Sequence, residues 1–255
     1  MQALCEAKNH ALVLDDALIE NSIRSIINAA FGCAGQRCMA LPVVVLQESI
    51  ADRLIPLLLQ ETEKIKTGPA YDQASQMGPV TTRGQLDLIL GKIETGCKEG
   101  AKLLLDGRNI RIKNHEKGFY LAPTIFDQVG PKMSIGQEEI FGPVLCLKRV
   151  KNFEEGLDLI NANQFANGTV IFTQNGHYSR EFVKRIHAGM VGINAGIPVP
   201  AGIFPFSGHK NSFFGDLHTL GRDGFRFYTE TKCVTSAWPE RETDTVNKGT
   251  WDGTV

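Results

Sequence analysis

The chain has 255 residues, and its 27 basic and 28 acidic side chains give a formal net charge of -1. This balance carries no electrostatic signature of nucleic-acid or anionic-membrane binding. Apolar runs such as 41–46 fall far short of the ~20 residues that cross a bilayer, and the first residues lack the basic and apolar regions of a secretory signal. We therefore expect an intracellular protein of one large or two small globular domains, with no nucleic-acid and no membrane partner.

Short β-branched runs alternate with longer amphipathic segments along the chain. Residues 10–14 are typical of a strand, and Asp15 or Asp16 is expected to cap the helix that follows over 18–31. Apolar side chains recur every four residues through that helix. They are Ile19, Ile23, Ile27 and Phe31.

The rest of the chain continues this alternation. We expect strands over 42–46, 103–105, 144–150, 169–173 and 191–194, and helices over 49–66, 86–97, 153–160 and 180–187. Ser49 and Asn152 are the expected caps of two of these helices. The alternation predicts an α/β fold of three layers around a mostly parallel sheet.

Two segments depart from the pattern. Residues 108–117 are charged and aperiodic, which favours a loop or hairpin facing solvent. Residues 197–221 are rich in Gly, Pro, Ser and Phe, and a loop of that length is usually functional or wraps another part of the protein.

The six cysteines form no C-x-x-C motif, and no histidine pair lies at zinc-ligand spacing from them, so we expect no metal site. Most of them are expected to be small buried residues. Cys38 is the exception, because it ends the Gly-rich turn FGCAGQRC that joins the first helix to the second strand. Arg37 beside it would favour the nucleophilic thiolate. A buried structural cysteine, with Arg37 as an ordinary ion-pair partner, is the alternative.

Two motifs resemble signatures of the aldehyde dehydrogenase superfamily. FGCAGQRC (31–38) resembles the nucleophile signature, and IGQEEIFGPV (135–144) resembles the second one. Three further stretches resemble the methylmalonate/malonate semialdehyde dehydrogenase branch. They are AKNH (7–10), GQRCMA (35–40) and NAGIPVPAGIFPFSG (194–208).

The resemblance assigns roles to five residues. It makes Cys38 the nucleophile that forms a thioester with the substrate, and the Cys38 N–H one half of the oxyanion hole. It makes Glu139 the ligand of the nicotinamide ribose of NAD, Phe141 the aromatic packed near that ring, and Cys5 a position whose backbone approaches the cofactor. Arg37 would bind the carboxylate of a semialdehyde substrate, because its planar group suits bidentate carboxylate binding.

One position departs from the family pattern. Leu4 occupies the place of the glutamate that activates water in most members, and leucine cannot act as a base. The semialdehyde branch also lacks this base and passes its thioester to coenzyme A. The resemblance thus implies NAD-dependent oxidative decarboxylation of methylmalonate or malonate semialdehyde to propionyl-CoA or acetyl-CoA. Rescue by Glu6, which would make a water-using aldehyde dehydrogenase, is the alternative.

The similarity runs from residue 1 to about Trp238. It implies a catalytic domain over 1–226 and a C-terminal oligomerisation strand over 227–238, with a polar tail over 239–255. We expect a homodimer or homotetramer, in a bacterial cytoplasm or a mitochondrial matrix.

The family is roughly twice this length, and its other half carries most NAD contacts and the oxyanion asparagine. We therefore expect this chain to be inactive alone and to bind NAD weakly or not at all. A non-catalytic domain that self-associates is the alternative from a different functional class.

Overall fold

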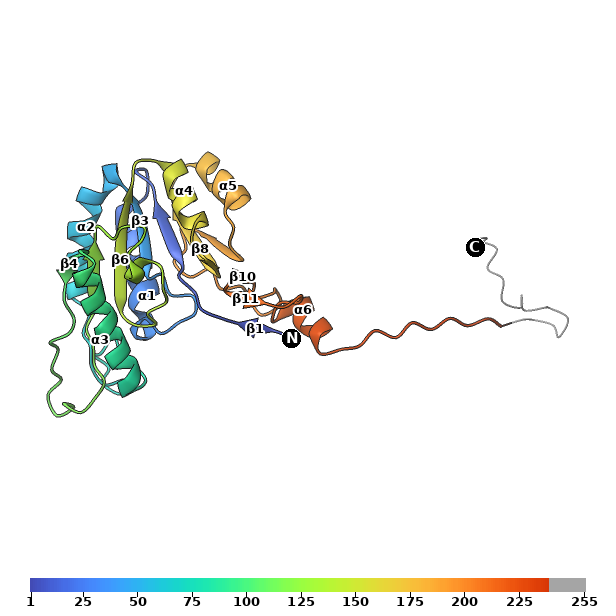
Figure 1. Ribbon diagram of the computed structural model, residues 1–255, viewed down its shortest axis with the longest axis horizontal. Coiled ribbons are helices and arrows are strands. Elements are labelled where there is room, and N and C mark those ends of the chain that lie inside the picture. Colours follow the sequence, from blue (N-terminus) through green and yellow to red (C-terminus); the bar gives the residue numbers. More distant parts are fainter. Residues whose placement is uncertain (239–255) are drawn as a thin grey trace.

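The computed structural model describes residues 1–238, and the tail expected over 239–255 lies outside the described residues. Its centre is a seven-stranded sheet with helices on both faces, which confirms the three-layer α/β prediction (Figure 1). In spatial order the strands are β4 (Lys102–Leu105), β5 (Thr124–Asp127), β6 (Val144–Val150), β3 (Val43–Gln47), β2 (His10–Val13), β8 (Gly168–Phe172) and β9 (Met190–Ile193).

The β4–β5 pair is antiparallel, and the other neighbouring pairs of this sheet are parallel. Parallel strands are covered on both faces and therefore read as continuous apolar runs. Strand β3 fits this rule, since Val43 to Leu46 are all buried. The antiparallel β4 lies at one edge of the sheet, where its residues are only partly buried.

The helices divide between the two faces because parallel crossovers are right-handed. Helix α1 (Ile19–Phe31) leads from β2 to β3 in one direction along the sheet, and α2 (Glu48–Glu63) packs beside it. The crossovers from β6 to β8 and from β8 to β9 run in the opposite direction, so their helices α4 (Phe153–Asn161) and α5 (Gly176–Arg185) cover the other face. Helix α3 (Arg83–Lys98) lies on the same face as α4. No helix among the described residues has the length and apolarity needed to cross a membrane.

Two expected helix caps are wrong. Leu18 is the N-cap of α1, and no side chain caps it. Asp16 instead accepts hydrogen bonds from Thr173 Oγ1 at 2.7 Å and from Gln174 N at 3.0 Å, which ties the turn after β2 to the end of β8. Likewise Gln47 is the N-cap of α2, so Ser49 lies inside that helix.

The prediction of a cap at Asn152 is confirmed, since its side chain accepts a hydrogen bond from Glu155 N at 3.0 Å. Local polar side chains predict caps well only where no distant partner competes for them.

The long segment 197–221 wraps the opposite end of the chain. It contains β10 (His209–Lys210), which pairs with β7 (Phe165–Ala166), and β11 (Phe213–Phe214), which pairs with β1 (Ala3–Leu4).

Helix α6 (Gly221–Phe227) follows the segment. Residues 229–238 then form no helix or strand and run out from the body (Figure 1). The oligomerisation strand over 227–238 is therefore not formed within one chain, and it stays a prediction.

The expectation that most cysteines are buried is wrong. Only Cys146 is buried, and Cys5, Cys33, Cys38, Cys97 and Cys233 are exposed. On α3 the buried face ends at Gly96, where an added Cβ would meet the Ile135 side chain at 2.7 Å, so Cys97 turns outward. The described residues contain no group of His, Cys, Asp and Glu side chains that could hold a metal ion.

The ionisable side chains buried in and beside the sheet include Lys8, His10, Cys146 and Lys148. His10 and Cys146 share one face, because both pair in register with Val43. Burial lowers the pKa of His10 to about 3 and that of Lys148 to about 8, and it raises the pKa of the Cys146 thiol. Burial therefore favours the uncharged form of each group.

We expect His10 to make the fold acid-sensitive. The unfolded chain takes up a proton on His10 near pH 6.5, whereas the folded chain resists protonation to about pH 3. The free energy of unfolding therefore decreases as the pH falls below 6.5, by about 3 kcal/mol at pH 4. Urea unfolding of His10→Gln should show less loss over this range, with exposed His177→Gln as the control. Equal losses in all three proteins would show that His10 is not responsible.

Candidate functional site

The candidate residues gather at the amino-terminal edge of the sheet. Cys38 lies in the loop before β3, Glu139 and Phe141 lie in the loop before β6, and residues 5–9 lead into β2. These three strands are neighbours in the order β6-β3-β2, so their preceding loops meet in space. Open α/β sheets usually bind ligands at the opposite, carboxyl edge.

Cys38 is exposed in a turn because the chain reverses sharply after α1. The short 3-10 turn η1 (Gly32–Gly35) places Cys33 and Ala34 at a φ of 54°, in the left-handed region. Two consecutive residues in this left-handed conformation bend the chain away from the axis of α1. The bend carries Cys38 out of the helix and back toward β3, with its side chain toward solvent.

Two buried asparagines hold the backbone of Cys38. Asn9 Nδ2 donates to the Cys38 carbonyl oxygen at 3.0 Å and to that of Ala40 at 2.7 Å. Asn167 Nδ2 donates to the same Cys38 oxygen at 3.0 Å. Among the described residues, nothing accepts a hydrogen bond from the Cys38 N–H. The peptide is thus fixed through its carbonyl while its N–H stays available.

The loop of Cys38 touches the loop of Glu139 at a pair of glycines. A Cβ added to Gly35 would lie 2.2 Å from the Gly142 carbonyl oxygen, and Gly35 has a φ of +69°. Gln85 on α3 fixes the other side of the second loop, because its Nε2 donates to the carbonyls of Ile140 and Phe141 at 3.0 Å each. The two loops therefore sit in direct contact on a rigid support.

The structure separates the two adjacent carboxylates. Glu138 is exposed and forms an ion pair with Lys92 on α3. Glu139 is half-buried and turned inward, where its Oε1 accepts a hydrogen bond from Ala7 N at 3.1 Å. Its Oε2 has no partner among the described residues. Burial raises the pKa of the Glu139 carboxyl above its usual value.

Arg37 is half-buried and lies against the end of α1. Its Nη1 donates to the Asn28 carbonyl oxygen at 3.2 Å, and its guanidinium rests over Gly32. A cation at this place complements the partial negative charge of a helix C-terminus. No carboxylate among the described residues pairs with Arg37, so its other N–H groups remain available.

A small cavity joins four of the five predicted site residues. Arg37, Cys38, Glu139 and Phe141 line it, and Ala7 and Asn9 are among the other lining residues. Its volume of about 10 Å³ accommodates about one water molecule. Cys5 is not part of the lining; its side chain is exposed, and its N–H donates to the Ser212 carbonyl at 3.0 Å.

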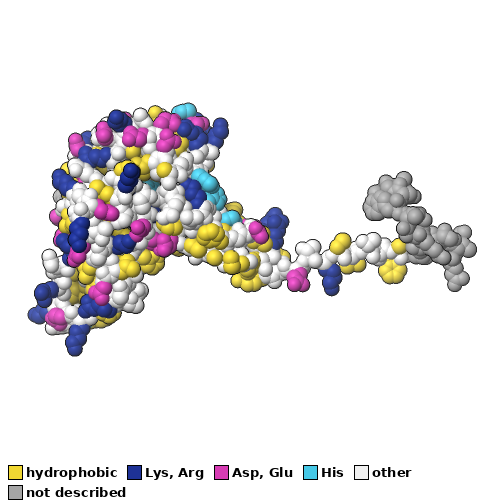
Figure 2. Space-filling model, in the orientation of Figure 1, with side chains coloured by type: hydrophobic (Ala, Val, Ile, Leu, Met, Phe, Trp, Pro, Cys, Tyr) yellow, Lys and Arg dark blue, Asp and Glu magenta, His cyan; other side chains and the backbone are white. Residues whose placement is uncertain are grey.

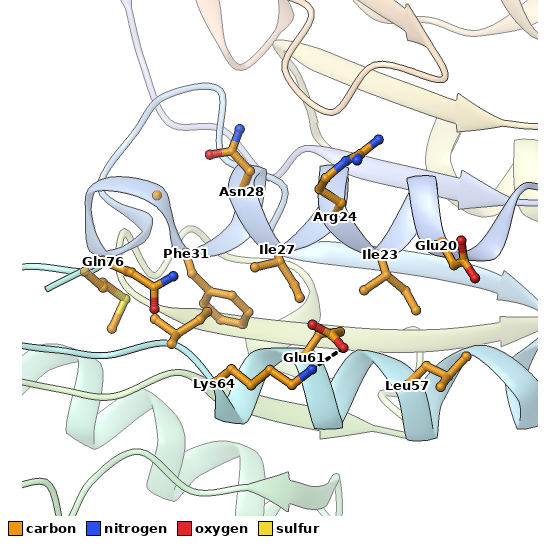
Figure 3. A pocket seen from close by; sticks show the side chains of 13 residues that line it. Glu20, Ile23, Arg24, Ile27, Asn28, Phe31, Leu57, Glu61, Lys64 and Gln76 are labelled. Atoms are coloured by element: carbon orange, nitrogen blue, oxygen red, sulfur yellow. Dashed lines mark hydrogen bonds and ion pairs between the residues drawn. The ribbon is translucent and has the colours of Figure 1, made fainter. Parts of the chain in front are cut away.

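A larger hollow of about 760 Å³ lies between α1 and α2 and adjoins the Arg37 side of the site at Gly32. Figure 3 shows Ile23, Ile27 and Phe31 pointing from α1 toward α2, while Arg24 and Asn28 point away. The hollow contains neither Cys38 nor Glu139 among its lining residues.

Known proteins are similar to this chain over nearly its whole length. The model of the aldehyde dehydrogenase family matches residues 1–234. The chain belongs to the aldehyde dehydrogenase family. It is similar to malonate-semialdehyde dehydrogenase 2 of Oceanobacillus iheyensis, with 49% identity over 238 residues that make up 93% of this chain and 49% of that relative. Malonate-semialdehyde dehydrogenase of Pseudomonas aeruginosa is 44% identical over 94% of this chain and 49% of its own length.

Solved structures of this family give the same result. A putative methylmalonate-semialdehyde dehydrogenase from Sinorhizobium meliloti, complexed with NAD, superposes with a TM-score of 0.93 and 41% identity, over 95% of this chain and 50% of that one. Methylmalonate-semialdehyde dehydrogenase from Oceanimonas doudoroffii superposes with a TM-score of 0.92 and 45% identity, over 94% of this chain and 49% of that one. The chain spans about half the length of the aldehyde dehydrogenases that it matches.

Sequence reasoning missed the residues that support the candidate site. Asn9 lies within the AKNH motif, but the motif served only as a mark of resemblance. Asn167 has no local signal, because it contacts Cys38 across 129 residues of sequence. The close approach of Gly35 and Gly142 could have been suspected from a glycine in each signature, since glycine often marks close backbone contact.

Replacing Gly35 by alanine should destabilise the protein more than the backbone conformation alone requires. An alanine held in the left-handed backbone conformation costs about 1 kcal/mol of stability, and its Cβ would also clash with the Gly142 carbonyl. Gly100→Ala is the matched control, because Gly100 has a φ of +90° with nothing within 4 Å of its Cβ position. Urea unfolding should show a loss at least about 2 kcal/mol larger for Gly35→Ala. Equal losses would mean that the loops are not held by this contact.

Proposed function

We propose that this chain carries the catalytic half of an NAD-dependent, CoA-acylating semialdehyde dehydrogenase. The substrate class is malonate or methylmalonate semialdehyde, and the products are acetyl-CoA or propionyl-CoA with CO2. The observation that carries the proposal is the shared cavity, which places the exposed Cys38 beside Arg37 and Glu139. The names of the relatives support the substrate class.

Cys38 acts as the nucleophile. Its thiolate attacks the aldehyde carbon, and the carbonyl oxygen becomes the oxyanion of a thiohemiacetal. The free Cys38 N–H donates to this oxyanion, and because the asparagine amides already fix the Cys38 carbonyl, the peptide does not reorganise as the charge develops.

Glu139 and Phe141 fit the nicotinamide end of NAD. Glu139 presents a carboxylate oxygen without a partner, which suits a ribose hydroxyl, and Phe141 is 38% exposed at the cavity. When bound, NAD accepts the hydride from the aldehyde carbon. A cavity of about 10 Å³ cannot enclose a dinucleotide, so the remaining contacts belong to the half of the relatives that this chain does not match.

Arg37 binds the carboxylate of the semialdehyde. Its free N–H groups can form charge-assisted hydrogen bonds to both carboxylate oxygens, which orients the aldehyde toward Cys38. Oxidation leaves a thioester on Cys38 that still carries the carboxylate. The bond between the α carbon and the carboxylate then breaks, CO2 departs, and the thioester enolate that remains takes up a proton from water, so that the acyl group stays on the sulfur.

Coenzyme A removes the acyl group. Leu4 pairs with Phe213 in the β1–β11 sheet and does not line the cavity, and neither does Glu6. Leucine cannot act as a base, and the exposed Glu6 lies outside the cavity, which supports transfer of the acyl group to CoA and not to water. The thiolate of CoA attacks the acyl carbon, and the Cys38 thiolate leaves.

We further propose that residues 227–238 join a second copy of the chain in a homodimer or homotetramer. After Phe227, the last residue of α6, this segment leaves the body (Figure 1), and apolar side chains are exposed along it (Figure 2). The large exposed ones include Tyr228, Val234 and Trp238. An extended segment without a strand partner is suited to adding to the sheet edge of a neighbour.

The reaction can be tested in a hybrid in which this chain replaces the matching half of the Oceanobacillus iheyensis relative. The hybrid should reduce NAD with malonate semialdehyde, release CO2 and form acetyl-CoA, at a rate that depends on CoA. Cys38→Ser should lower the rate by at least about 10³-fold, because the nucleophile is lost. Full-rate formation of free acid without CoA would contradict the proposal and make Glu6 the first candidate for a base.

A further inference from the structure

Gly32 lies directly beneath the guanidinium group of Arg37. A Cβ added to Gly32 would lie 2.5 Å from both Nη1 and Nη2 and 2.6 Å from the central carbon. Gly32 has a φ of -55° and a ψ of 136°, a conformation open to any residue. The backbone conformation therefore does not require glycine at position 32. Glycine is required because the guanidinium of Arg37 occupies the space that a Cβ would take.

The end of α1 fixes the guanidinium over this glycine. The Asn28 carbonyl accepts the backbone N–H of Gly32, the C-cap residue, and also Arg37 Nη1 at 3.2 Å. Asn28 lies in the last turn of the helix, and its carbonyl oxygen has a second lone pair, which accepts the Arg37 guanidinium beside the helical bond. Arg37 is thus held at one end by the helix while it lines the same cavity as Cys38.

We propose that Gly32 is a positioning residue that sets the selectivity of the site for carboxylate-bearing substrates. The missing side chain lets the guanidinium lie flat against the end of α1, with its free N–H groups available to a carboxylate at Cys38. Any larger residue displaces the guanidinium from this place. The inference rests on the proposed role of Arg37 and deepens it.

The geometry separates this role from a structural one. The atoms that a Cβ would displace are the far end of a flexible, half-exposed side chain and not the backbone. Gly32→Ala should therefore keep the fold, with an unfolding midpoint in urea equal to that of the wild type. Recognition of a carboxylate should change all the same.

Alkylation of Cys38 in this chain measures that recognition. Iodoacetate and iodoacetamide deliver similar alkyl groups, but only iodoacetate carries a carboxylate. The readout is the ratio of the two rates at Cys38, obtained by peptide mapping and divided by the same ratio at the exposed Cys97. The iodoacetate-to-iodoacetamide rate ratio at Cys38, relative to that at Cys97, should exceed one in the wild type. It should fall at least threefold in Gly32→Ala. Gly84→Ala, with nothing within 4 Å of its Cβ position, should leave it unchanged.

Substitutions of Arg37 distinguish its proposed role in carboxylate binding from the proposed positioning role of Gly32. Arg37→Gln should lower the ratio, and an unchanged ratio there would contradict the proposed carboxylate role of Arg37 itself. A ratio lowered by Arg37→Gln but not by Gly32→Ala would overturn only the role of Gly32.

A double variant keeps the test decisive. In an Arg37→Lys background the planar group is gone, so Gly32→Ala should have little further effect on the ratio. A further fall as large as in the wild-type background would show that Gly32 acts independently of the guanidinium, which would overturn the proposal. If Gly32→Ala shifts the unfolding midpoint substantially, the role is structural and the proposal is likewise overturned.

Discussion

The arrangement of the site depends on the side-chain amide of Asn9. Its two N–H groups donate to the carbonyls of Cys38 and Ala40, and its oxygen accepts the Gly168 N–H at 2.9 Å. Every polar atom of this buried side chain is thus used. Asn9 precedes β2 at the centre of the sheet, and the groups that it binds lie before β3 on one side and at the start of β8 on the other. The side-chain amide of Asn9 therefore fixes the positions of both neighbouring segments relative to β2.

The residues beside Asn9 extend the same control to the third loop. The Ala7 N–H holds Glu139 in the loop before β6, so the peptide from Ala7 to Asn9 contacts every loop that contributes to the site. Lys8 between them is buried, and burial lowers the pKa of its amine. Burying such a group is costly, and the Lys8 Nζ has no hydrogen-bond partner among the described residues. The peptide from Ala7 to Asn9 thus links the three loops of the site, alongside the hydrogen bonds from Asn167 and Gln85.

Much of the fold could be predicted from the sequence because periodicity reports directly on local structure. The apolar run at Val43 and the four-residue spacing through α1 correspond to elements in the expected places. The nucleophile signature likewise placed Cys38 in the turn between the first helix and the second strand, and the comparisons confirm the family.

The remaining features depend on contacts between distant parts of the chain. Asp16 looked like a local cap but binds Thr173, and a pattern confined to one element cannot report such a partner. The exposure of Cys97 follows from packing of Ile135 on Gly96, which is also a contact between separate elements. Roles carried over from the family name the residues of the proposed chemistry, but they do not point to Asn9, which binds the backbone of the Cys38 loop.

Hydrogen exchange of Asn9→Ala, with exposed Asn109→Ala as the control, tests this account most directly. Loss of the amide should speed exchange in peptides covering 36–42 and 166–170 together, since each loses a hydrogen bond to the same side chain. Peptides of α3 should exchange as in the wild type. Unchanged protection of 36–42 in Asn9→Ala would show that the Cys38 loop is held by other contacts, and would contradict the account.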